Sequence, residues 1–343
     1  MGKKDYKYKE QEIKLIIDKI VNRTMQIDFT WDWPCGVAFY GICKAWEVTQ
    51  NKSYLDFLIK WVDEYLEIGI PPFTINTISM GHTMITLYEA TGDDKYLEIA
   101  VNKAEYLKNK AVRFGENVFQ HTVSQDADFP EQAWADTLFM AAYFLLRMGI
   151  KLKNDDYIND GLNQYYWHEE LLQDEKTNLY YHGWDNINQN NMSGIFWARG
   201  NAWAALTMAE ALKLINYLYP MFMQIEGSLR DQLSALVRLQ SPEGLWHTVL
   251  TDNISYLEIS ASAGIATSLV VNSHPLHDKY IIRAFEGISN NISDNGTVTN
   301  VSAGTAVMPN IESYKEVPKK RIQGWGQGLA LAFFSSILKY KVK

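Results

Sequence analysis

Apolar residues recur at the i, i+3, i+4 and i+7 spacing of an amphipathic helix along almost the whole sequence. No stretch with the period of a strand competes over a comparable length, although short ones near His121, Tyr180, Trp246 and Val298 are compatible with hairpin arms in connecting loops. The sequence therefore predicts an all-α protein. Its twelve predicted helices cover residues 8–25, 35–50, 53–68, 77–91, 94–111, 131–148, 155–172, 199–218, 222–240, 256–271, 278–290 and 322–340.

Several odd-numbered helices of this series begin with the same local pattern. A Ser, Asn or Asp that can cap the helix is followed by an aromatic and an aliphatic residue, as in Ser53-Tyr54-Leu55 and Asp156-Tyr157-Ile158. This recurrence indicates an internal repeat of six helical hairpins. Six hairpins close most economically into a double ring of helices, but an open superhelical stack has the same periodicity.

Composition and charge limit the range of partners. No Pro-, Gly- or Ser-rich linker interrupts the pattern, so residues 1–343 are expected to form a single domain. A formal net charge of −8 disfavours a surface for nucleic acid or anionic membranes. No run of about 18 apolar residues predicts a membrane span, and residues 1–15 lack the apolar core of a signal peptide. We therefore expect a cytoplasmic protein.

The unusual residues of the chain gather at the N-terminal ends of the even-numbered helices. If these six helices run parallel inside the ring, their N-termini meet at one mouth and add positive partial charge that suits an anionic ligand. Tryptophans that serve only the core would instead spread along the helices. The gathered residues are Trp31, Trp33, Asn76, Trp134, Asp136, Trp197, Arg199, Trp203, Glu258, Trp325 and Gln327.

Asp136 stands inside an otherwise apolar helix start, next to Trp134 in the segment EQAWADTLFMAAY. Burial there would raise the pKa of the carboxyl and make it a general acid and base. An Asp near a helix N-terminus can equally serve as a cap held by free amides and the helix dipole. From this segment alone, both interpretations stay open.

The other polar groups at the mouth also allow two interpretations. Arg199 can hold a carboxylate with its planar fork, or it can form a structural salt bridge or stack on Trp203. His121 and His182 fall in loops expected at the same mouth, where each can orient a hydroxyl or carboxylate or simply face solvent. Neither histidine has the spacing of a metal ligand, so no metal is expected. The tryptophans can stack on a sugar ring or pack in the core, and their shared location favours a carbohydrate site.

Four ordered motifs resemble glycoside hydrolase family 105, the unsaturated rhamnogalacturonyl hydrolases, which are related to the unsaturated glucuronyl hydrolases of family 88. The resemblance covers nearly the whole chain, from Trp33 to the last helix. It implies an (α/α)6 barrel, in agreement with the twelve predicted helices. The motifs are Trp134-Ala-Asp136-Thr137, Trp197-Ala-Arg199-Gly-Asn201-Ala-Trp203, Glu258-Ile-Ser260-Ala-Ser262-Ala and Gly324-Trp325-Gly326-Gln327-Gly328.

The resemblance implies a hydrolase that needs no cofactor and acts on a product of a polysaccharide lyase. Such a product ends in a sugar acid with a C4=C5 double bond, here expected to be a galacturonyl residue from pectin. By its motif, Asp136 would protonate C4 and then serve as base for the water that adds at C5. The family pattern places the sugar ring among Trp33, Trp197, Trp203 and Trp325, with Arg199 and His182 toward the carboxylate and hydroxyls and His121 at the rim. From its shared location with these tryptophans, Trp134 is expected at the same substrate site.

One position departs from the family pattern. Where the family has a second acid, at the start of the fourth helix, this chain has Asn76. An amide there can bind a ring hydroxyl but cannot tune the charge of Asp136. Two alternatives therefore stay open: a sugar epimerase on the same barrel, working through His121 and His182, and a non-catalytic uronate-binding protein. The leaving sugar, the uronyl epimer and the oligomeric state are not determined by the sequence.

Overall fold

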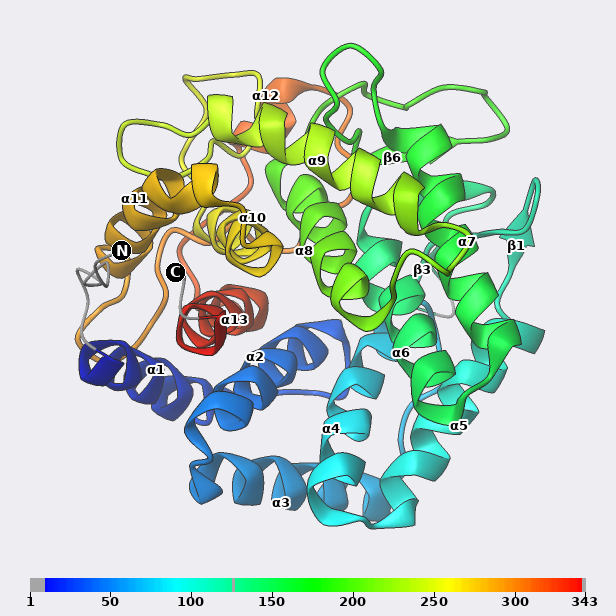
Figure 1. Cartoon of the computed structure of the whole chain (residues 1–343), viewed down its shortest axis with the longest axis vertical. Helices are drawn as coiled ribbons and strands as arrows, with labels where there is room; N and C mark the ends of the chain where they lie inside the picture. The colour runs from blue at the N-terminus through cyan, green and yellow to red at the C-terminus, as the bar shows by residue number, and fades with distance from the viewer. Residues whose placement is uncertain (1–9, 125–126, 341–343) are drawn as a thin grey trace.

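The structure, a computed structural model, describes residues 10–124 and 127–340. All twelve predicted helices are present, which confirms the all-α prediction, and they form two concentric rings (Figure 1). The outer ring consists of α1 (Glu10–Thr24), α3 (Lys52–Ile68), α5 (Asp94–Asn109), α7 (Asp155–Leu172), α9 (Phe222–Arg238) and α11 (Asp278–Ser289). The inner ring consists of α2 (Trp33–Thr49), α4 (Gly81–Thr91), α6 (Tyr143–Leu152), α8 (Ala198–Leu214), α10 (Ile259–Asn272) and α13 (Gly324–Tyr340).

The inner ring is closed. The last inner helix, α13, packs against both α10 and the first inner helix, α2, and α10 packs against α8 (Figure 1). An open superhelical stack would leave α2 and α13 at opposite ends of the molecule. The chain is therefore an (α/α)6 barrel, whereas the extension of one domain over residues 1–343 stays a prediction.

Burial differs between the two rings because an inner helix is surrounded and an outer helix is not. The inner helix α10 buries every residue from Ile259 to Val271. The outer helix α11 buries Ile281, Ala284, Phe285 and Ile288, which form one stripe at three- and four-residue spacing. Stripes of this kind are the amphipathic pattern visible in the sequence.

Two glycines let α2 and α13 approach backbone to backbone. A Cβ atom added at Gly328 would lie 2.0 Å from the carbonyl oxygen of Val37, and one added at Gly41 would lie 2.4 Å from the carbonyl oxygen of Gly328. Both distances are far inside van der Waals contact, so neither position accepts a side chain without moving a helix. This contact closes the ring.

A buried polar cluster spans the barrel interior between α2 and α8. Lys44 Nζ lies 3.1 Å from Glu210 Oε1, and the hydroxyls of Tyr40 and Tyr143 donate to the same carboxylate at 3.5 and 3.3 Å. Lys44 and Glu210 stand in the C-terminal halves of their helices. The cluster therefore fills the barrel axis away from the end where the inner helices begin.

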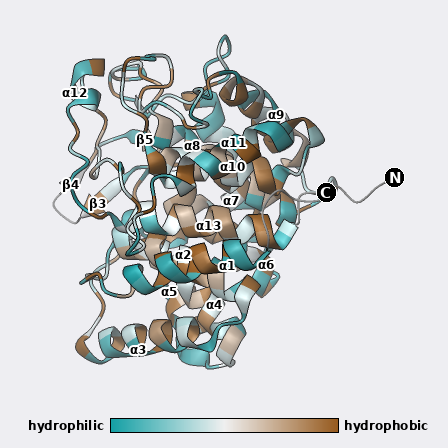
Figure 2. Cartoon of the chain, turned by 90° about the vertical axis from the view of Figure 1, so that its left-hand side faces the viewer, coloured by the Kyte–Doolittle hydropathy of each residue, from teal (hydrophilic) through white to brown (hydrophobic). Residues whose placement is uncertain are grey.

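The connections at the N-terminal ends of the inner helices carry the small elements of the fold. The second inner helix, α4, is preceded by a 3₁₀ turn, η1 (Asn76–Met80), and α6 is preceded by a π-helical turn, η2 (Leu138–Ala142). Figure 2 shows β3, β4, β5 and the short helix α12 (Ile311–Lys315) at one end of the molecule. A further 3₁₀ turn, η3 (Pro275–His277), precedes α11. The strands are β1 (Arg113–Phe114) with β2 (Val118–Phe119), β3 (Thr122–Ser124) with β4 (Ala127–Asp128), and β5 (Gln132–Trp134) with β6 (Gly183–Asp185), all antiparallel.

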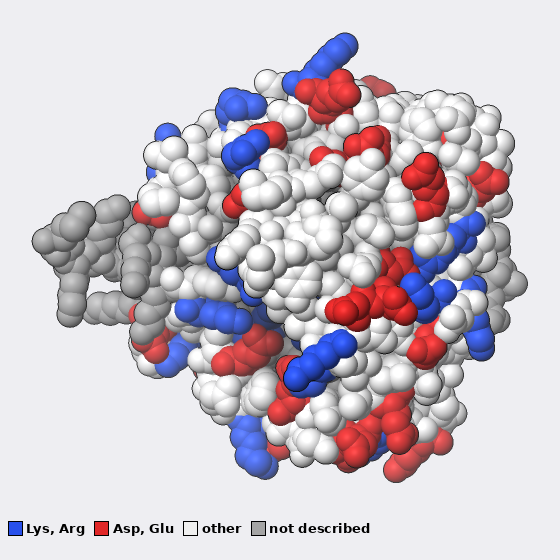
Figure 3. Space-filling model, turned by 45° about the vertical axis from the view of Figure 1, so that its right-hand side comes forward, with Lys and Arg blue, Asp and Glu red and all other residues white. Residues whose placement is uncertain are grey.

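The outer surface carries both signs of charge. On the face shown in Figure 3, acidic and basic side chains are interspersed. Lys95 of α5 and Asp63 of α3 form a pair between two outer helices, and Lys151 of α6 and Glu89 of α4 form one between two inner helices, each at 3.0 Å. Among the described residues, the structure contains no helix with the length and apolar composition that a bilayer crossing requires.

The contact between α2 and α13 can be tested with a matched pair of glycine substitutions. Gly328→Ala should lower the free energy of unfolding by about 1–3 kcal/mol, because the new methyl group overpacks a backbone contact. Gly227→Ala, in the outer helix α9 where nothing lies within 4 Å of the added Cβ, should raise it by about 0.5–1 kcal/mol. Thermal unfolding midpoints measure both, and equal shifts in the two variants would contradict the close approach.

Candidate active site

A cavity of about 240 Å³ opens where the inner helices begin. Its walls come from segments far apart in the sequence, including the starts of α2, η1 and α8 and the turn before η2. The convergence that the sequence predicts is thereby present for these four inner segments. The lining residues are Trp33, Asn76, His121, Val123, Phe129, Trp134, Asp136, Met140, Trp197, Arg199, Gly304, Thr305 and Ala306.

Strand pairing brings Asp136 and His182 together. In the ladder of β5 and β6, Trp134 lies opposite Gly183, and beyond it the amide of Ala135 donates to the carbonyl of His182 at 3.0 Å. The residue after Ala135 is Asp136, whose Oδ2 lies 3.5 Å from Nε2 of His182. Both atoms are buried, and neither has another hydrogen-bond partner among the described residues, so each is left to the other.

The position of Asp136 corrects the expected direction of its pKa. Burial raises the pKa of this carboxyl, but the hydrogen bonding and charge of His182, with smaller contributions from His121 and Arg199, outweigh it and leave the pKa below its ordinary value. The carboxyl retains access to the cavity, with 15% of its side chain exposed. In the free protein, Asp136 is therefore ionised at neutral pH.

The two histidines differ in their surroundings. His121 lies flat on Trp134, with ring centroids 4.4 Å apart, and its Nδ1 lies 3.0 Å from the hydroxyl of Thr137. Burial lowers its pKa to about 4, although Asp136 acts in the opposite direction. His182 does not line the cavity but stands behind Asp136, and burial lowers its pKa as well. Both rings are therefore neutral at pH 7.

Arg199 lines the cavity, but both Nη atoms of its guanidinium group already donate hydrogen bonds to other residues of the protein. Nη1 donates to the hydroxyl and the carbonyl of Ser302 at 2.7 and 3.2 Å, and Nη2 donates to the carbonyl of Ala303 at 2.8 Å. Glu258, the N-cap of α10, lies 3.5 Å from Nη1 and is itself fully buried. Arg199 thus combines the salt bridge considered from the sequence with a position at the cavity wall, and it holds the loop that contributes Gly304 to that wall.

The expected tryptophans divide into cavity walls and supports. Trp33, Trp134 and Trp197 line the cavity. Trp325 stacks on Trp33, with centroids 4.4 Å apart, and donates through Nε1 to the carbonyl of Ser302 at 3.1 Å. It therefore supports the wall from behind.

Two other tryptophans of the gathered set belong to the core. Trp203 is fully buried and packs on Phe139 at 4.8 Å, which places it beneath the cavity and corrects the expectation of contact with a sugar ring. Trp31 stacks on Trp61 of the outer helix α3, at 5.9 Å. Neither of them lines the cavity.

Asn76 begins η1 at the cavity wall. It is 5% exposed, and its side-chain oxygen has no hydrogen-bond partner among the described residues. The neighbouring carbonyl of Thr77 accepts a hydrogen bond from the buried ammonium of Lys103 at 2.7 Å, which fixes the turn. An unpaired amide oxygen in this position can accept a hydrogen bond from a hydroxyl group of a ligand.

Several lining residues were not found from the sequence. Phe129 packs on Trp134 at 4.4 Å, and residues 304–306 close the opposite side of the cavity. These residues lie in connections without periodicity, so no pattern identified them. In the structure Gly304 lies close to Trp33, because a Cβ added to it would be 3.5 Å from that ring.

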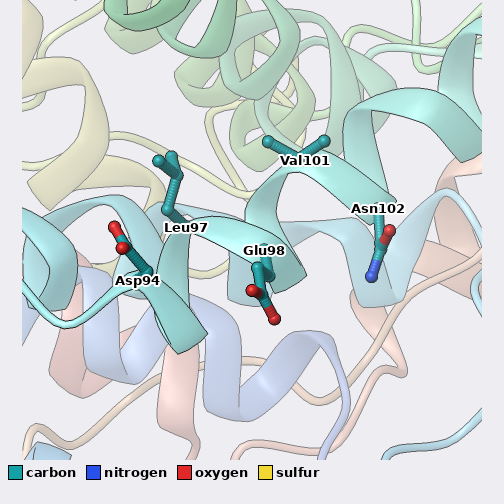
Figure 4. A pocket seen from close by; sticks show the side chains of 5 residues that line it. All are labelled: Asp94, Leu97, Glu98, Val101 and Asn102. Carbon is teal, nitrogen blue, oxygen red and sulfur yellow. The ribbon is translucent and has the colours of Figure 1, made fainter.

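A wider hollow of about 410 Å³ lies elsewhere, on the outer helix α5. Figure 4 shows that its five residues, Asp94, Leu97, Glu98, Val101 and Asn102, follow one face of that helix. Its charged groups, Asp94 and Glu98, are both acidic. Within the described ranges, no group of three or more His, Cys, Asp or Glu residues is placed to hold a metal ion. The cavity at Asp136 is the candidate active site on chemical grounds.

Comparison with known proteins identifies the family of the chain. The model of Glycosyl Hydrolase Family 88 matches residues 8–341. The unsaturated rhamnogalacturonyl hydrolase YesR of Bacillus subtilis is 57% identical over 335 residues, which cover 97% of each chain. A Salmonella enterica protein described as a possible member of the GH105 family superposes with a TM-score of 0.94 at 25% identity, over 98% of this chain and 96% of that one. The unsaturated glucuronyl hydrolase of Bacillus sp. GL1 shares the fold, with a TM-score of 0.75 at 14% identity over 94% of each chain.

The ion pair behind the cavity wall yields a stability prediction. Glu258→Gln keeps the size of the side chain but leaves the buried charge of Arg199 without its counter-charge, which should lower the free energy of unfolding by about 3 kcal/mol. Thermal unfolding measures this change. Asp231→Asn removes the exposed partner of Arg230 and should change the free energy by less than about 1 kcal/mol. A Glu258→Gln variant as stable as this control would show that the pair is not needed for stability.

Proposed function

Because the chain belongs to glycosyl hydrolase family 88, we propose that it removes a Δ4,5-unsaturated uronyl residue from the non-reducing end of a short oligosaccharide made by a polysaccharide lyase. The name of the Bacillus subtilis relative and its coverage of nearly the whole chain support a galacturonyl residue linked to rhamnose, as in pectin. The enzyme is a glycoside hydrolase. The expected cytoplasmic location stays a prediction.

The single observation that carries the proposal is the solitary acid at the cavity. Asp136 is the one acidic side chain among the described residues that line it. Glycosidases that cleave saturated sugars use two carboxyl groups on either side of the scissile bond. Hydration of a vinyl ether needs one group that first gives a proton and then takes one, and Asp136 fits this requirement.

The proposed reaction begins with transfer of the Asp136 proton to C4 of the sugar. The double-bond electrons form the new C–H bond, and C5 acquires oxocarbenium character. Water then adds at C5 while the Asp136 carboxylate accepts one of its protons, which restores the acid. The resulting hemiketal opens by breaking the bond from C5 to the ring oxygen. The hemiacetal left at C1 then releases the aglycone as an alcohol, so one water is consumed in each turnover.

The surrounding residues fit an anionic sugar. The charge of Arg199 and the N-terminus of α8 attract the sugar carboxylate, although the Arg199 fork itself is bound to the loop at Ser302. Trp33 and Trp197 offer ring faces, and the free amide oxygen of Asn76 accepts from a hydroxyl. His121 is buried in the cavity wall, stacked on Trp134. We propose these residues as substrate-binding groups.

The epimerase alternative is not favoured. Its two histidines would need free nitrogen atoms on either side of a substrate, but His121 Nδ1 is bonded to Thr137 and His182 stands behind Asp136. The Bacillus subtilis relative, which is similar over nearly the whole chain, is named a hydrolase. A non-catalytic uronate-binding protein remains an outcome of the test below.

The proposed function predicts that the protein bleaches an unsaturated disaccharide. Decay of the ultraviolet absorbance of the conjugated double bond follows the reaction directly. Asp136→Asn should slow this decay by about 1000-fold or more, because the amide can neither give nor take the proton. Asp231→Asn, on the outer helix α9, is the matched control and should retain full activity. Binding without decay in the wild-type protein would instead select the non-catalytic alternative.

The low pKa of Asp136 predicts a dependence on pH. The first step needs the protonated acid, so kcat/KM should fall as pH rises above the pKa of Asp136 in the free enzyme. A bound uronate adds a negative charge near the carboxyl and raises its pKa. The alkaline limb of kcat should therefore lie at higher pH than that of kcat/KM. Steady-state rates from pH 4 to 9 measure both limbs, and an activity that rises with pH throughout would contradict Asp136 as the acid.

A further inference from the structure

Both ring nitrogens of His182 face a defined partner. Nε2 lies 3.5 Å from Oδ2 of Asp136, and Nδ1 lies 2.6 Å from the hydroxyl oxygen of Tyr314. The His182 amide also donates to the carbonyl of Ile195 at 3.2 Å, and its carbonyl accepts from the amide of Ala135. The backbone and the ring are therefore both held, and the contact with Tyr314 is the shorter of the two ring contacts.

The direction of the Tyr314 hydrogen bond follows from its other partner. The amide of Met308 lies 3.2 Å from the Tyr314 hydroxyl, and an amide can only donate. The hydroxyl thus accepts from Met308 and has its own proton left for Nδ1 of His182. Burial raises the pKa of the Tyr314 phenol, so this proton is present throughout the neutral range. Together with the ionised carboxyl of Asp136, which needs a donor on Nε2, this makes Nδ1 the acceptor in the pair.

A neutral imidazole carries one proton, and a hydrogen bond accepted at one nitrogen places that proton on the other. With Nδ1 occupied as an acceptor, the His182 proton resides on Nε2 and faces Asp136. At 3.5 Å the contact is longer than a well-formed hydrogen bond, as is common for catalytic groups before a substrate is bound. The opposite tautomer would aim a lone pair at Asp136, and a protonated Asp136 would then donate to His182 rather than to the sugar.

Tyr314 acts from behind the site. It belongs to α12, is fully buried, and packs in a small apolar cluster with Ile195, Trp197 and Val249. It is absent from the cavity lining, so it has no contact with a substrate there. The short helix α12 lies at the same end of the molecule as β5, which leads into Asp136 (Figure 2).

We propose that Tyr314 is a positioning residue that fixes the Nε2–H tautomer of His182 and so directs a hydrogen-bond donor at Asp136. The inference rests on the proposed function, because it assigns a role to a group that acts on the general acid. The proposal also assigns a role to the short helix α12, which carries Tyr314. Through Met308 and Tyr314, the loop that Arg199 anchors at Ser302 is linked to the catalytic carboxyl.

The first test measures the tautomer directly and needs no substrate. The full chain is labelled with ¹⁵N-histidine, and the long-range proton–nitrogen spectrum identifies which nitrogen of each of the seven histidines is protonated. Loss of one signal set in His182→Gln assigns His182. We expect a protonated Nε2 and a bare Nδ1 in the wild type, and mixed or reversed tautomers in Tyr314→Phe. A wild-type His182 protonated at Nδ1, or an unchanged tautomer in Tyr314→Phe, would overturn the proposal.

The second test measures turnover. Tyr314→Phe should lower kcat about tenfold or more, as expected for the loss of one hydrogen bond of about 1.4 kcal/mol in the transition state, while KM changes by less than about threefold. Tyr165→Phe is the matched control, because it removes another fully buried hydroxyl, bonded to the carbonyl of Thr207 at 3.3 Å. Equal losses of kcat in both variants would contradict a specific role for Tyr314.

The outcomes separate this inference from the proposed function. A wild-type protein that bleaches the substrate, loses activity in Asp136→Asn and keeps it in Tyr314→Phe would disprove only the role of Tyr314. A wild-type protein that binds without bleaching would disprove the proposed function, while the tautomer measurement would still decide the hydrogen-bond arrangement. If Tyr314→Phe fails to fold, the wild-type spectrum alone decides, since protonation at Nδ1 contradicts the proposal.

Discussion

The inner helices form a closed ring because α2 and α13 meet at glycines, where the backbone of one helix touches that of the other. The close approach of Gly41 and Gly328 makes the first and last inner helices neighbours. Closure then brings the starts of four inner segments around one cavity. The residues of the candidate site owe their proximity to this closure, since residues as distant in the chain as Trp33 and Thr305 line the same cavity.

The fold could be predicted from the sequence because burial in a double ring of helices imposes a regular spacing of apolar residues. Outer helices repeat an apolar stripe and begin with cap residues, and all twelve predicted ranges contain a helix. The sixth predicted range began too early, since its first residues form β5 and a π-helical turn rather than an α-helix. A pattern of apolar residues does not distinguish a strand followed by a π-helical turn from an α-helix here, because both conformations bury the same side chains.

The candidate site was predictable only in part, and the reason differs between residues. Trp33 and Trp203 both stand near inner-helix starts, but their positions around the helix place one at the cavity and the other beneath it. The low pKa of Asp136 depends on His182, which reaches it through the pairing of β5 with β6. Tyr314 and residues 304–306 lie in connections whose course no local pattern determines. Periodicity gives the elements, whereas charge and contact between distant segments require the three-dimensional structure.

The filled barrel axis has a consequence for how the protein meets its substrate. Beneath the cavity, Trp203, Phe139 and Tyr40 pack in succession, and the cluster around Glu210 continues the filling toward the other end. A sugar that enters at the mouth has to leave by the same route. A cavity that is closed at its inner end admits a chain terminus but not the middle of a polymer. It also offers no groove along which the enzyme could move processively on a polymer. This geometry fits an enzyme that removes one terminal unit per encounter and releases its products before it binds the next chain end.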